Sequence, residues 1–360
     1  MVMTASAVDL FCGAGGLTHG FIKEGVSVNA GIDLDPACRY PFEFNNRSRF
    51  IEKDITKVSV AELRRLYPKG QIRILAGCAP CQPFSTYTNG LKAQEDVKWG
   101  LLSEFSRLAV GLRPEIVTME NVPNLRKHAV FHEFKQALVD AGYRVSVFIV
   151  DCSLYRIPQK RKRLVLLASR LGTIDLVPPP GDVKKPVTVR KIIGKLPAIR
   201  AGEQWKRDRM HKASTLSDLN MRRIRASTPG GTWRDWEESL VAECHKKKTG
   251  KTFPGVYARM EWDAPGPTIT TQFFGFGNGR FGHPDQDRAI SLREGAMLQT
   301  FPKGYRFVDP SQEVQIKAVG RLIGNAVPVR LGRVVAKSIA RHLESVGGTE
   351  NDTVRRKPKL

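Results

Sequence analysis

Residues 9–17 read Asp-Leu-Phe-Cys-Gly-Ala-Gly-Gly-Leu, and they join a short apolar run to a stretch of helical spacing. Glycines at such a turn let backbone N–H groups approach a ligand closely. The dinucleotide pattern G-x-G-x-x-G is not met, because Thr18 stands where its last glycine would be. Asp33 ends the next apolar run, where an acidic side chain can accept hydrogen bonds from ribose hydroxyls. Loop and acid together predict a nucleoside cofactor, although a tight turn with a capping aspartate would look the same.

Short apolar runs alternate with helical spacing outward from this turn. The candidate strands are Ala7–Phe11, Ser27–Ile32, Ile72–Ala76, Ile116–Glu120, Val145–Val150 and Leu164–Ala168. Helical spacing separates several of them, as at 61–67 and 130–141, and it returns at 292–299 and 329–343. This alternation predicts a doubly wound, Rossmann-like α/β sheet that binds ligands beyond the carboxyl ends of its strands.

The charge of the chain favours a polyanionic partner. Its 360 residues carry 58 Lys and Arg against 35 Asp and Glu, a formal net charge of +23. Residues 181–280 alone hold 20 basic and 10 acidic side chains. Because each neutralised phosphate releases counterions, nucleic acid is the leading candidate. A cationic surface kept for solubility, or a ribosome-associated protein, would explain the same balance.

A change of composition and periodicity at Pro178–Pro180 predicts a domain boundary. The three prolines and Gly181 open a long stretch that is rich in Lys, Arg, Gly and Trp and has little periodicity. We expect a sheet domain at 1–175 and a second, smaller, irregular domain at 176–315. A return to the sheet domain should follow at 316–346, and then a disordered basic tail at 347–360.

The cysteines indicate a reduced protein without a metal site. Six are scattered along a chain too long to need disulfide staples, and no second Cys-x-x-Cys pair stands at zinc-finger spacing. The apolar runs are far shorter than the ~20 residues that span a bilayer. No basic segment precedes an apolar stretch at the N-terminus. We therefore expect a cytoplasmic protein that has no membrane partner.

Two further motifs carry the chemistry. Residues 77–85 read Gly-Cys-Ala-Pro-Cys-Gln-Pro-Phe-Ser, and a cysteine in such a proline-bounded turn can present its thiolate to a ligand. Glu120 ends another predicted strand, so it should project at the same edge of the sheet as Cys81. A thiolate beside an acid suits covalent attack on a heterocycle. Cys78 and Cys81 could instead be a redox pair, and Glu120 a salt-bridged carboxylate.

Six blocks in order resemble the bacterial type of DNA (cytosine-5)-methyltransferase. They are Asp9–Gly16, Pro80-Cys81-Gln82, Glu120-Asn121-Val122, Gln159-Lys160-Arg161-Lys162-Arg163, Arg293–Gln299 with Phe301-Pro302, and Gly324-Asn325-Ala326-Val327-Pro328. The resemblance covers about 7–343. Only about 180–285 lacks the family's pattern, and there the family keeps its variable target-recognition segment. The resemblance therefore implies that 176–315 is a target-recognition domain and 1–175 a catalytic and cofactor-binding domain.

The resemblance also implies S-adenosylmethionine as cofactor and double-stranded DNA as partner. The cofactor positions would be Phe11, Gly13, Ala14, Gly16, Asp33, Leu34, Asp54, Ile55 and Asn325. Asp33 would hold the ribose and Asp54 with Ile55 the adenine, while Asn325 would help to join the sheet domain to the rest of the site. Two positions depart from the family: Leu34 replaces a frequent aromatic residue, and Lys53 a frequent glycine.

The implied catalytic residues are Cys81, Glu120, Arg161 and Arg163. Cys81 would attack C6 of the cytosine, Glu120 would bind its N3 and amino edge, and Arg163 would hold its O2. Arg161 and Gln159 would support that arginine. The implied DNA-binding residues are Gln82, Ser85 and Gln159.

Base flipping implies a mobile loop, for which we expect 85–101 with hinges at Gly90 and Gly100. In the recognition domain, Lys246-Lys247-Lys248 are candidates for phosphate contacts. The arginines at 222, 223 and 225 and the stretch 272–280 are candidates for base contacts. We expect a monomer that associates with the bacterial nucleoid through DNA and serves restriction–modification or phage defence.

Three alternatives use part of the same pattern. A nicotinamide oxidoreductase would use the glycine loop and Asp33 but leaves Cys81 and Glu120 without purpose. A DNA reader derived from a methyltransferase would usually lack the nucleophile or the acid, and both are present here. An RNA-modifying relative shares the pocket chemistry, although the long basic segment favours duplex DNA.

Overall fold

The computed structural model describes residues 4–80, 95–181, 186–248 and 250–355. The chain divides into two compact units. Unit 1 comprises Met1–Asp151, Lys162–Pro179 and Val329–Leu360, and unit 2 comprises Cys152–Arg161 and Pro180–Pro328. We expected boundaries at 176 and 316, whereas unit 2 begins at Pro180, extends to Pro328 and also includes 152–161. The functional names of the domains stay a prediction.

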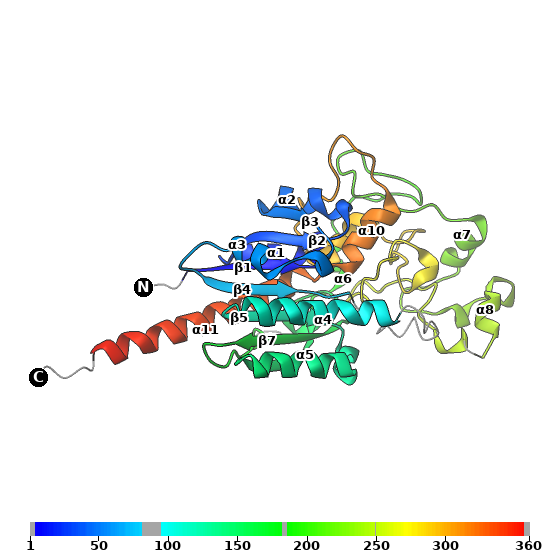
Figure 1. Cartoon of the computed structure of the whole chain (residues 1–360). Coiled ribbons are helices and arrows are strands. Elements are labelled where there is room, and N and C mark those ends of the chain that lie inside the picture. The colour runs from blue at the N-terminus through cyan, green and yellow to red at the C-terminus, as the bar shows by residue number, and fades with distance from the viewer. Residues whose placement is uncertain (1–3, 81–94, 182–185, 249, 356–360) are drawn as a thin grey trace, which may run out of the picture. The chain divides into compact units, whose positions relative to one another are not determined.

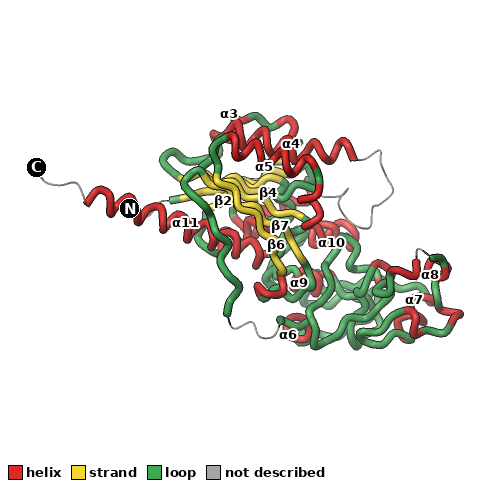
Figure 2. Tube along the Cα trace, turned by 90° about the horizontal axis from the view of Figure 1, so that it is seen from below, coloured by secondary structure: helices red, strands yellow, loops and turns green. Residues whose placement is uncertain are grey.

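A seven-stranded sheet forms the centre of unit 1 (Figures 1 and 2). Its strands are β1 (Ala5–Leu10), β2 (Ser27–Asp33), β3 (Arg49–Glu52), β4 (Ile72–Gly77), β5 (Ile116–Asn121), β6 (Arg144–Asp151) and β7 (Lys162–Ser169). They lie in the order β3-β2-β1-β4-β5-β7-β6, and β7 runs antiparallel to both of its neighbours. The doubly wound prediction and all six predicted strands are confirmed. Only β3 was missed, because four residues are too few for a periodic signal.

Helices cover both faces of the sheet. Unit 1 contains α1 (Gly16–Lys23), α2 (Arg39–Asn46), α3 (Val60–Arg65), α4 (Glu95–Leu112), α5 (Ala129–Asp140) and α11 (Val329–Arg355), with the short helices η1 (Pro36–Cys38), η2 (Ile55–Lys57) and η4 (Pro123–Lys127). Figure 2 shows α3, α4 and α5 on one face of the sheet and α11 on the other. Helices α3, α4 and α5 pack against the strands through side chains that are fully buried or nearly so, namely Leu63, Phe105, Leu108, Phe134 and Leu138.

On the other face, α1 and α11 cross at two glycines. A Cβ at Gly20 would lie 2.6 Å from the backbone oxygen of Val329, and a Cβ at Gly332 would lie 2.9 Å from that of Leu17. The two helices can therefore approach this closely only because both positions are glycine. The helix α11 continues to Arg355, so most of the tail that we expected to be disordered is helical. No proline interrupts the chain there before Pro358.

Unit 2 has short helices and no strand among its described residues. The helices of unit 2 are η5 (Cys152–Tyr155), α6 (Val189–Ile193), α7 (Asp218–Arg225), η6 (Trp233–Asp235), η7 (Glu238–Leu240), α8 (Glu243–Lys246), η8 (Gly250–Thr252), η9 (Phe276–Asn278), α9 (Leu292–Leu298) and α10 (Ile316–Asn325). A small core joins Ile224, Trp233, Trp236, Leu240 and Phe276. The predicted irregular second domain is therefore confirmed as a structure. Within the described ranges, no helix has both the length and the apolar character that crossing a membrane requires.

Candidate active site

The strand order reverses between β1 and β4. From β1 the chain proceeds to β2 and β3 on one side, and from β4 to β5 on the other. Doubly wound sheets bind ligands at such a switch point, beyond the carboxyl ends of the strands. The glycine loop follows β1 and the cysteine motif follows β4, so both begin at this edge.

The glycine loop adopts left-handed backbone conformations. Phe11, Gly13 and Gly15 have φ values of 56°, 52° and 83°. A Cβ at Gly13 would meet no atom within 4 Å, so the loop borders open space there. Gly15 is the N-cap of α1, whose first N–H groups have no partner inside the helix. Beneath the loop, Thr18 donates a 2.6 Å hydrogen bond to the buried Asp9, and burial raises the pKa of Asp9 to about 7.

Asp33 ties the loop to the end of β2. Its Oδ2 accepts from the N–H of Gly13 at 2.9 Å and its Oδ1 from that of Asp35 at 3.0 Å. Burial raises the pKa of this carboxyl. The next residue, Leu34, has 65% of its surface exposed and offers a free apolar face. The carboxylate of Asp33 is thus half-buried and fixed in direction beside an apolar platform.

The ends of β2 and β3 add the remaining candidates of unit 1. Asp33 pairs with Glu52 in the ladder, and its carbonyl accepts from Lys53 N at 3.0 Å. Asp54 follows and accepts from both N and Oγ1 of Thr56, while Ile55 is buried. The structure therefore brings the glycine loop, Asp33, Leu34, Asp54 and Ile55 to one edge of the sheet. Asn325 ends α10 in unit 2.

A second cluster surrounds Glu120, at the end of β5. Gly77 pairs with Met119 in the β4–β5 ladder, so Cys78 lies beside Glu120 and its thiol donates to Oε2 at 3.0 Å. From β7, Arg163 places its Nε 2.9 Å from Oε1. The side chains of Arg163 and Glu120 are only 13% and 5% exposed. The carboxylate is therefore held between a thiol and a guanidinium from the two neighbouring strands.

Asn121 anchors the start of the cysteine loop. Its Nδ2 donates to the carbonyl of Ala79 at 3.3 Å, and its Oδ1 accepts from Val122 N at 2.8 Å. Its side chain is buried. The chain is thus fixed two residues before Cys81. Cys81, Gln82, Ser85 and the expected hinge Gly90 lie outside the described residues.

Two expectations need correction. Gly100 is not a loop hinge, because it lies inside α4, which begins at Glu95. Gln159 was expected to contact DNA, yet it is fully buried within unit 2. Its Nε2 donates to Leu298 O and Gln299 Oε1, both at 2.8 Å, and its Oε1 accepts from Ile269 N at 2.9 Å. A carboxamide engaged in this way supports the fold and has no exposed atom for a base.

Of the other expected side chains, some are buried and support the fold, and others are exposed. Arg161 is also buried in unit 2 and donates to Ile269 O at 3.1 Å. Arg223 is buried too, donates to Leu240 O and lies over the ring of Tyr257, so it supports α7 and does not face solvent. Arg222 and the three lysines 246–248 are exposed.

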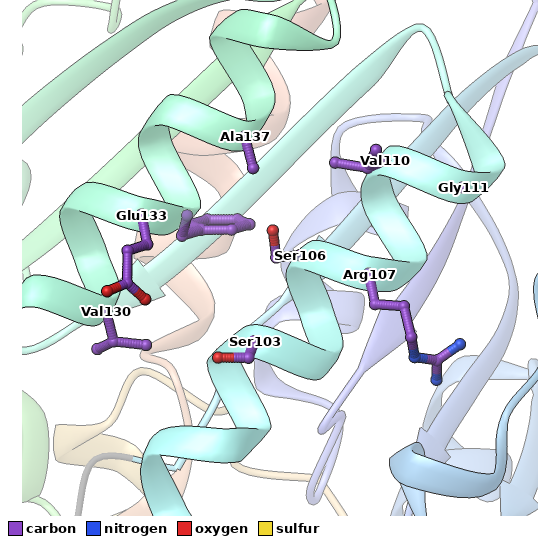
Figure 3. Close-up of a pocket in the computed structure, with 9 residues that line it drawn as sticks. Ser103, Ser106, Arg107, Val110, Gly111, Val130, Glu133 and Ala137 are labelled. Carbon is purple, nitrogen blue, oxygen red and sulfur yellow. The ribbon is translucent and has the colours of Figure 1, made fainter.

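The sequence offered Cys78 only a redox alternative with Cys81 and gave no separate role to Asn121. The only signal for Cys78 was its place in a Cys-x-x-Cys pair, and the partner of its thiol proves to be Glu120. A groove of about 540 Å³ lies between α4 and α5 (Figure 3). It is lined by Ser103, Arg107, Val110, Glu133 and Phe134 among others, and it contains none of the candidate site residues.

Comparison with known proteins identifies the family. The family described as C-5 cytosine-specific DNA methylase matches residues 5–341. The Type II methylase M.HgiDII of Herpetosiphon aurantiacus is 56% identical over 96% of this chain and 97% of its own length. The Type II methyltransferase M.Eco47II of Escherichia coli is 30% identical over 95% of this chain and 80% of its own.

Solved structures agree in fold. A putative DNA modification methyltransferase encoded within a prophage of E. coli matches with a TM-score of 0.71 and 20% identity, over 94% of this chain and 99% of its own. The S. pombe Dnmt2 methyltransferase matches with a TM-score of 0.60 and 17% identity, over 95% and 99%. The family match over nearly the whole length and the 56% identity to a Type II methylase show that the chain belongs to the C-5 cytosine-specific DNA methylases and is a DNA (cytosine-5)-methyltransferase.

Proposed function

We propose that this enzyme flips a cytosine out of double-stranded DNA and methylates its C5, with Cys81 as the nucleophile and S-adenosylmethionine as the methyl donor. The observation that carries the proposal is the Glu120 cluster. A buried carboxylate and a guanidinium lie 2.9 Å apart, next to the loop that leads to Cys81. Cytosine presents O2, N3 and its amino group side by side, so a neighbouring arginine and glutamate match that edge.

The protein's part in the reaction follows from these positions. The thiolate of Cys81 forms a bond to C6, and the electron pair of the C5–C6 double bond becomes available at C5 as Glu120 hydrogen-bonds to or protonates N3. Arg163 holds O2. When bound, S-adenosylmethionine supplies an electrophilic methyl group. Loss of the C5 proton then expels the thiolate and restores the ring. Extrusion of the base costs a few kcal/mol, which contacts with this pocket offset.

The edge formed by β1, β2 and β3 fits the cofactor. Gly13 borders open space, the carboxylate of Asp33 is fixed beside it, and Leu34 offers an exposed apolar face. We assign the ribose to Asp33 and the adenine to Leu34, Asp54 and Ile55. Phe11, Ala14 and Gly16 would shape the loop around the rest of the molecule. Asn325, which ends α10, stays a predicted cofactor residue.

Unit 2 is proposed as the target-recognition domain. Residues 181–280 hold 20 Lys and Arg against 10 Asp and Glu, which suits phosphate contacts. The similarity to enzymes named Type II methylases supports a place in a restriction–modification system. We further propose that the enzyme acts as a monomer on duplex DNA.

Bisulfite sequencing of DNA from cells that express the chain tests the activity and maps its target. We expect one short sequence context to be methylated, and its absence with Cys81→Ser. The Cys81→Ser variant should still bind DNA, because the thiolate adds only after recognition. Duplexes with 5-fluorocytosine at the mapped site should trap a covalent adduct with the wild-type enzyme, since fluorine cannot leave as a proton does. Methylation by Cys81→Ser near the wild-type rate, or no adduct on a methylated site, would refute the assignment.

A further inference from the structure

The edge of the sheet opposite the active site carries a row of arginines. Arg73 belongs to β4, Arg144 to β6, Arg170 directly follows β7, and Arg113 lies in the turn between α4 and β5. β4, β5, β7 and β6 are consecutive neighbours in the sheet. The edge is the one nearest the label N in Figure 1, where β1, β4 and β5 begin.

The strand register aligns these residues. Ile74 pairs with Ile116, Ile116 with Ser169, and Ser169 with Arg144. Arg73 stands one residue before Ile74, and Arg170 one residue after Ser169. Neighbouring strands are about 4.8 Å apart, so the row spans about 14 Å. One DNA strand carries about four phosphates over that length, at about 3.4 Å of helix axis for each.

Two guanidinium groups of this row meet at one backbone oxygen. Arg73 donates to the carbonyl of Arg113 at 3.0 Å, and Arg170 donates to the same oxygen at 3.2 Å. Glu115 is the acid beside them, and it forms a two-point ion pair with Arg73. In the described part of the chain, no acidic group pairs with Arg113, Arg144 or Arg170, and all three side chains are exposed. Like charges held this closely repel one another unless an anion lies over them.

Arg113 occupies a backbone position that favours glycine. Its φ is 49°, and its N–H closes the end of α4 on the carbonyl of Ala109. Helices commonly end on glycine or asparagine in this conformation. The side chain of Arg113 is exposed, and its backbone carbonyl is the oxygen to which Arg73 and Arg170 donate. A guanidinium presents donors in a planar fork that matches phosphate oxygens.

We propose that this row, Arg73, Arg113, Arg144 and Arg170, binds the phosphate backbone of a second DNA segment, separate from the duplex in the active site. The chemistry of recognition is purely electrostatic and independent of sequence. Such a contact would hold the enzyme on long DNA between target sites. The length of the row favours an extended polyanion over a single small anion.

The test compares two charge-matched double variants. In Arg113→Gln/Arg170→Gln the row loses two charges. In Arg47→Gln/Arg49→Gln the same charge is lost at the far end of the strand order, and Arg47 has a similar φ of 52°. The probe is a labelled dA·dT duplex of about 20 base pairs, which contains no cytosine to flip. Its affinity is measured by fluorescence anisotropy between about 50 and 200 mM salt.

We expect Arg113→Gln/Arg170→Gln to bind the probe about five- to tenfold more weakly at the lowest salt, with a salt slope reduced by about 2. Arg113→Lys/Arg170→Lys should keep the slope, because the charge remains. The control pair should bind like the wild type, and methylation of a plasmid at saturating DNA should be unchanged. Unchanged binding by the glutamine variant, or an equal loss in both pairs, would overturn the proposal.

A second measurement uses the unaltered enzyme. Phenylglyoxal modifies exposed arginines, and mass spectrometry identifies the modified peptides. Excess dA·dT duplex should protect Arg113 and Arg170 while Arg47 and Arg49 stay reactive. Equal reactivity of Arg113 and Arg170 with and without the duplex would overturn the proposal even if the variants failed to fold.

Discussion

Removal of Arg288 should unfold unit 2 at a markedly lower denaturant concentration. Its guanidinium makes a two-point ion pair with Glu294, at 2.7 and 2.8 Å, and the two side chains are 0% and 1% exposed. Burial alone would raise the pKa of Glu294, yet the hydrogen bonds and charge of Arg288 hold it at about 2 against an ordinary 4.5. This difference corresponds to about 3 kcal/mol of stability at neutral pH.

Arg288→Met would leave the carboxylate buried without this partner. Loss of one member of a buried pair costs about 3–5 kcal/mol, which agrees with the value from the pKa. The cost should depend on pH. In the wild type, the contribution of Glu294 is complete above pH 4.5 and is lost as the pH falls towards 2. Without Arg288, burial raises the folded-state pKa of Glu294 above 4.5. Protonation then removes the unpaired buried charge, so the loss of stability in the variant should become smaller as the pH falls from 7.5 to 5.5.

Protonation of His283 should also reduce the difference in stability between wild type and variant at lower pH. Burial lowers the pKa of its imidazole to about 4, and its Nε2 lies 3.7 Å from Glu294 Oε1. Arg288 is one of the charges that disfavour its protonation, so the variant should let His283 take up a proton beside Glu294 more readily. The gap in stability between wild type and variant should therefore narrow at lower pH.

Urea unfolding followed by tryptophan fluorescence measures the effect, since Trp205, Trp233, Trp236 and Trp262 all belong to unit 2. Arg288→Met/Glu294→Gln should recover part of the loss, because no unpaired buried carboxylate remains, while the carbonyls of Ile199 and Ala289 still lack their donor. Arg190→Met is the matched control, since the Arg190–Asp263 pair is exposed, and it should change little. A loss below about 1 kcal/mol for Arg288→Met, or the same loss at both pH values, would refute the reasoning.

Further predictions concern the site and the basic surface. Gly13→Ala should lose about 1–2 kcal/mol of stability from its left-handed backbone and bind S-adenosylmethionine more weakly in calorimetry; Gly70→Ala, at φ 75° with equal room, should lose similar stability and keep the cofactor affinity. Cys78→Ala should lower kcat about five- to tenfold in tritium transfer by removing the donor to Glu120, and Cys78→Ser should restore part of it; an equal rate in both variants would remove Cys78 from the positioning of Glu120. Joint replacement of Lys246, Lys247 and Lys248 by Gln should weaken binding to every duplex and reduce the salt slope by about 2–3, while the bisulfite map stays the same; a changed map would mean that these lysines read bases.

The sheet was predictable because its central strands β1, β4, β5 and β7 are mostly buried on both faces. Leu164–Ala168 is continuously apolar, and in Ile116–Glu120 only Thr118 and Glu120 are polar. The spacing of such runs predicts the alternation with helices. The same logic placed Glu120 and the cysteine motif at one edge. β3 was missed because Arg49–Glu52 has only four residues, of which two are apolar, and its pairing with β2 is decided by the tertiary fold.

The contacts inside the site were not predictable, because they depend on register. The sequence states that Cys78 and Glu120 follow or end strands, but only the pairing of Gly77 with Met119 brings the thiol to the carboxylate. For Gln159, the sequence predicted a contact with DNA, but the side chain is buried. It stands in a basic block that resembles a DNA-contacting segment, yet the connection from β6 to β7 carries its side chain into the interior of unit 2.

The net charge of +23 overstates the cations available to DNA, and the reason lies in the fold of unit 2. An irregular chain cannot pair its carbonyl groups in helices or ladders, and unpaired buried carbonyls are costly. Arginine offers five N–H donors, so one side chain can satisfy several carbonyls at once. Arg259 donates to the carbonyls of Ile224, Ser227, His283 and Gln286.

Other arginines of unit 2 do the same. Arg223 binds Leu240 O, Arg280 binds Gly231 O and Arg259 O, Arg288 binds Ile199 O and Ala289 O, and Arg293 binds Tyr305 O. These side chains hold irregular backbone together through hydrogen bonds, and their N–H donors in those bonds are not available to DNA. Lysine, with its single compact charge on a flexible stem, is poorly suited to that task. The exposed lysines 246–248 are therefore better candidates for phosphate contacts than the buried arginines of unit 2.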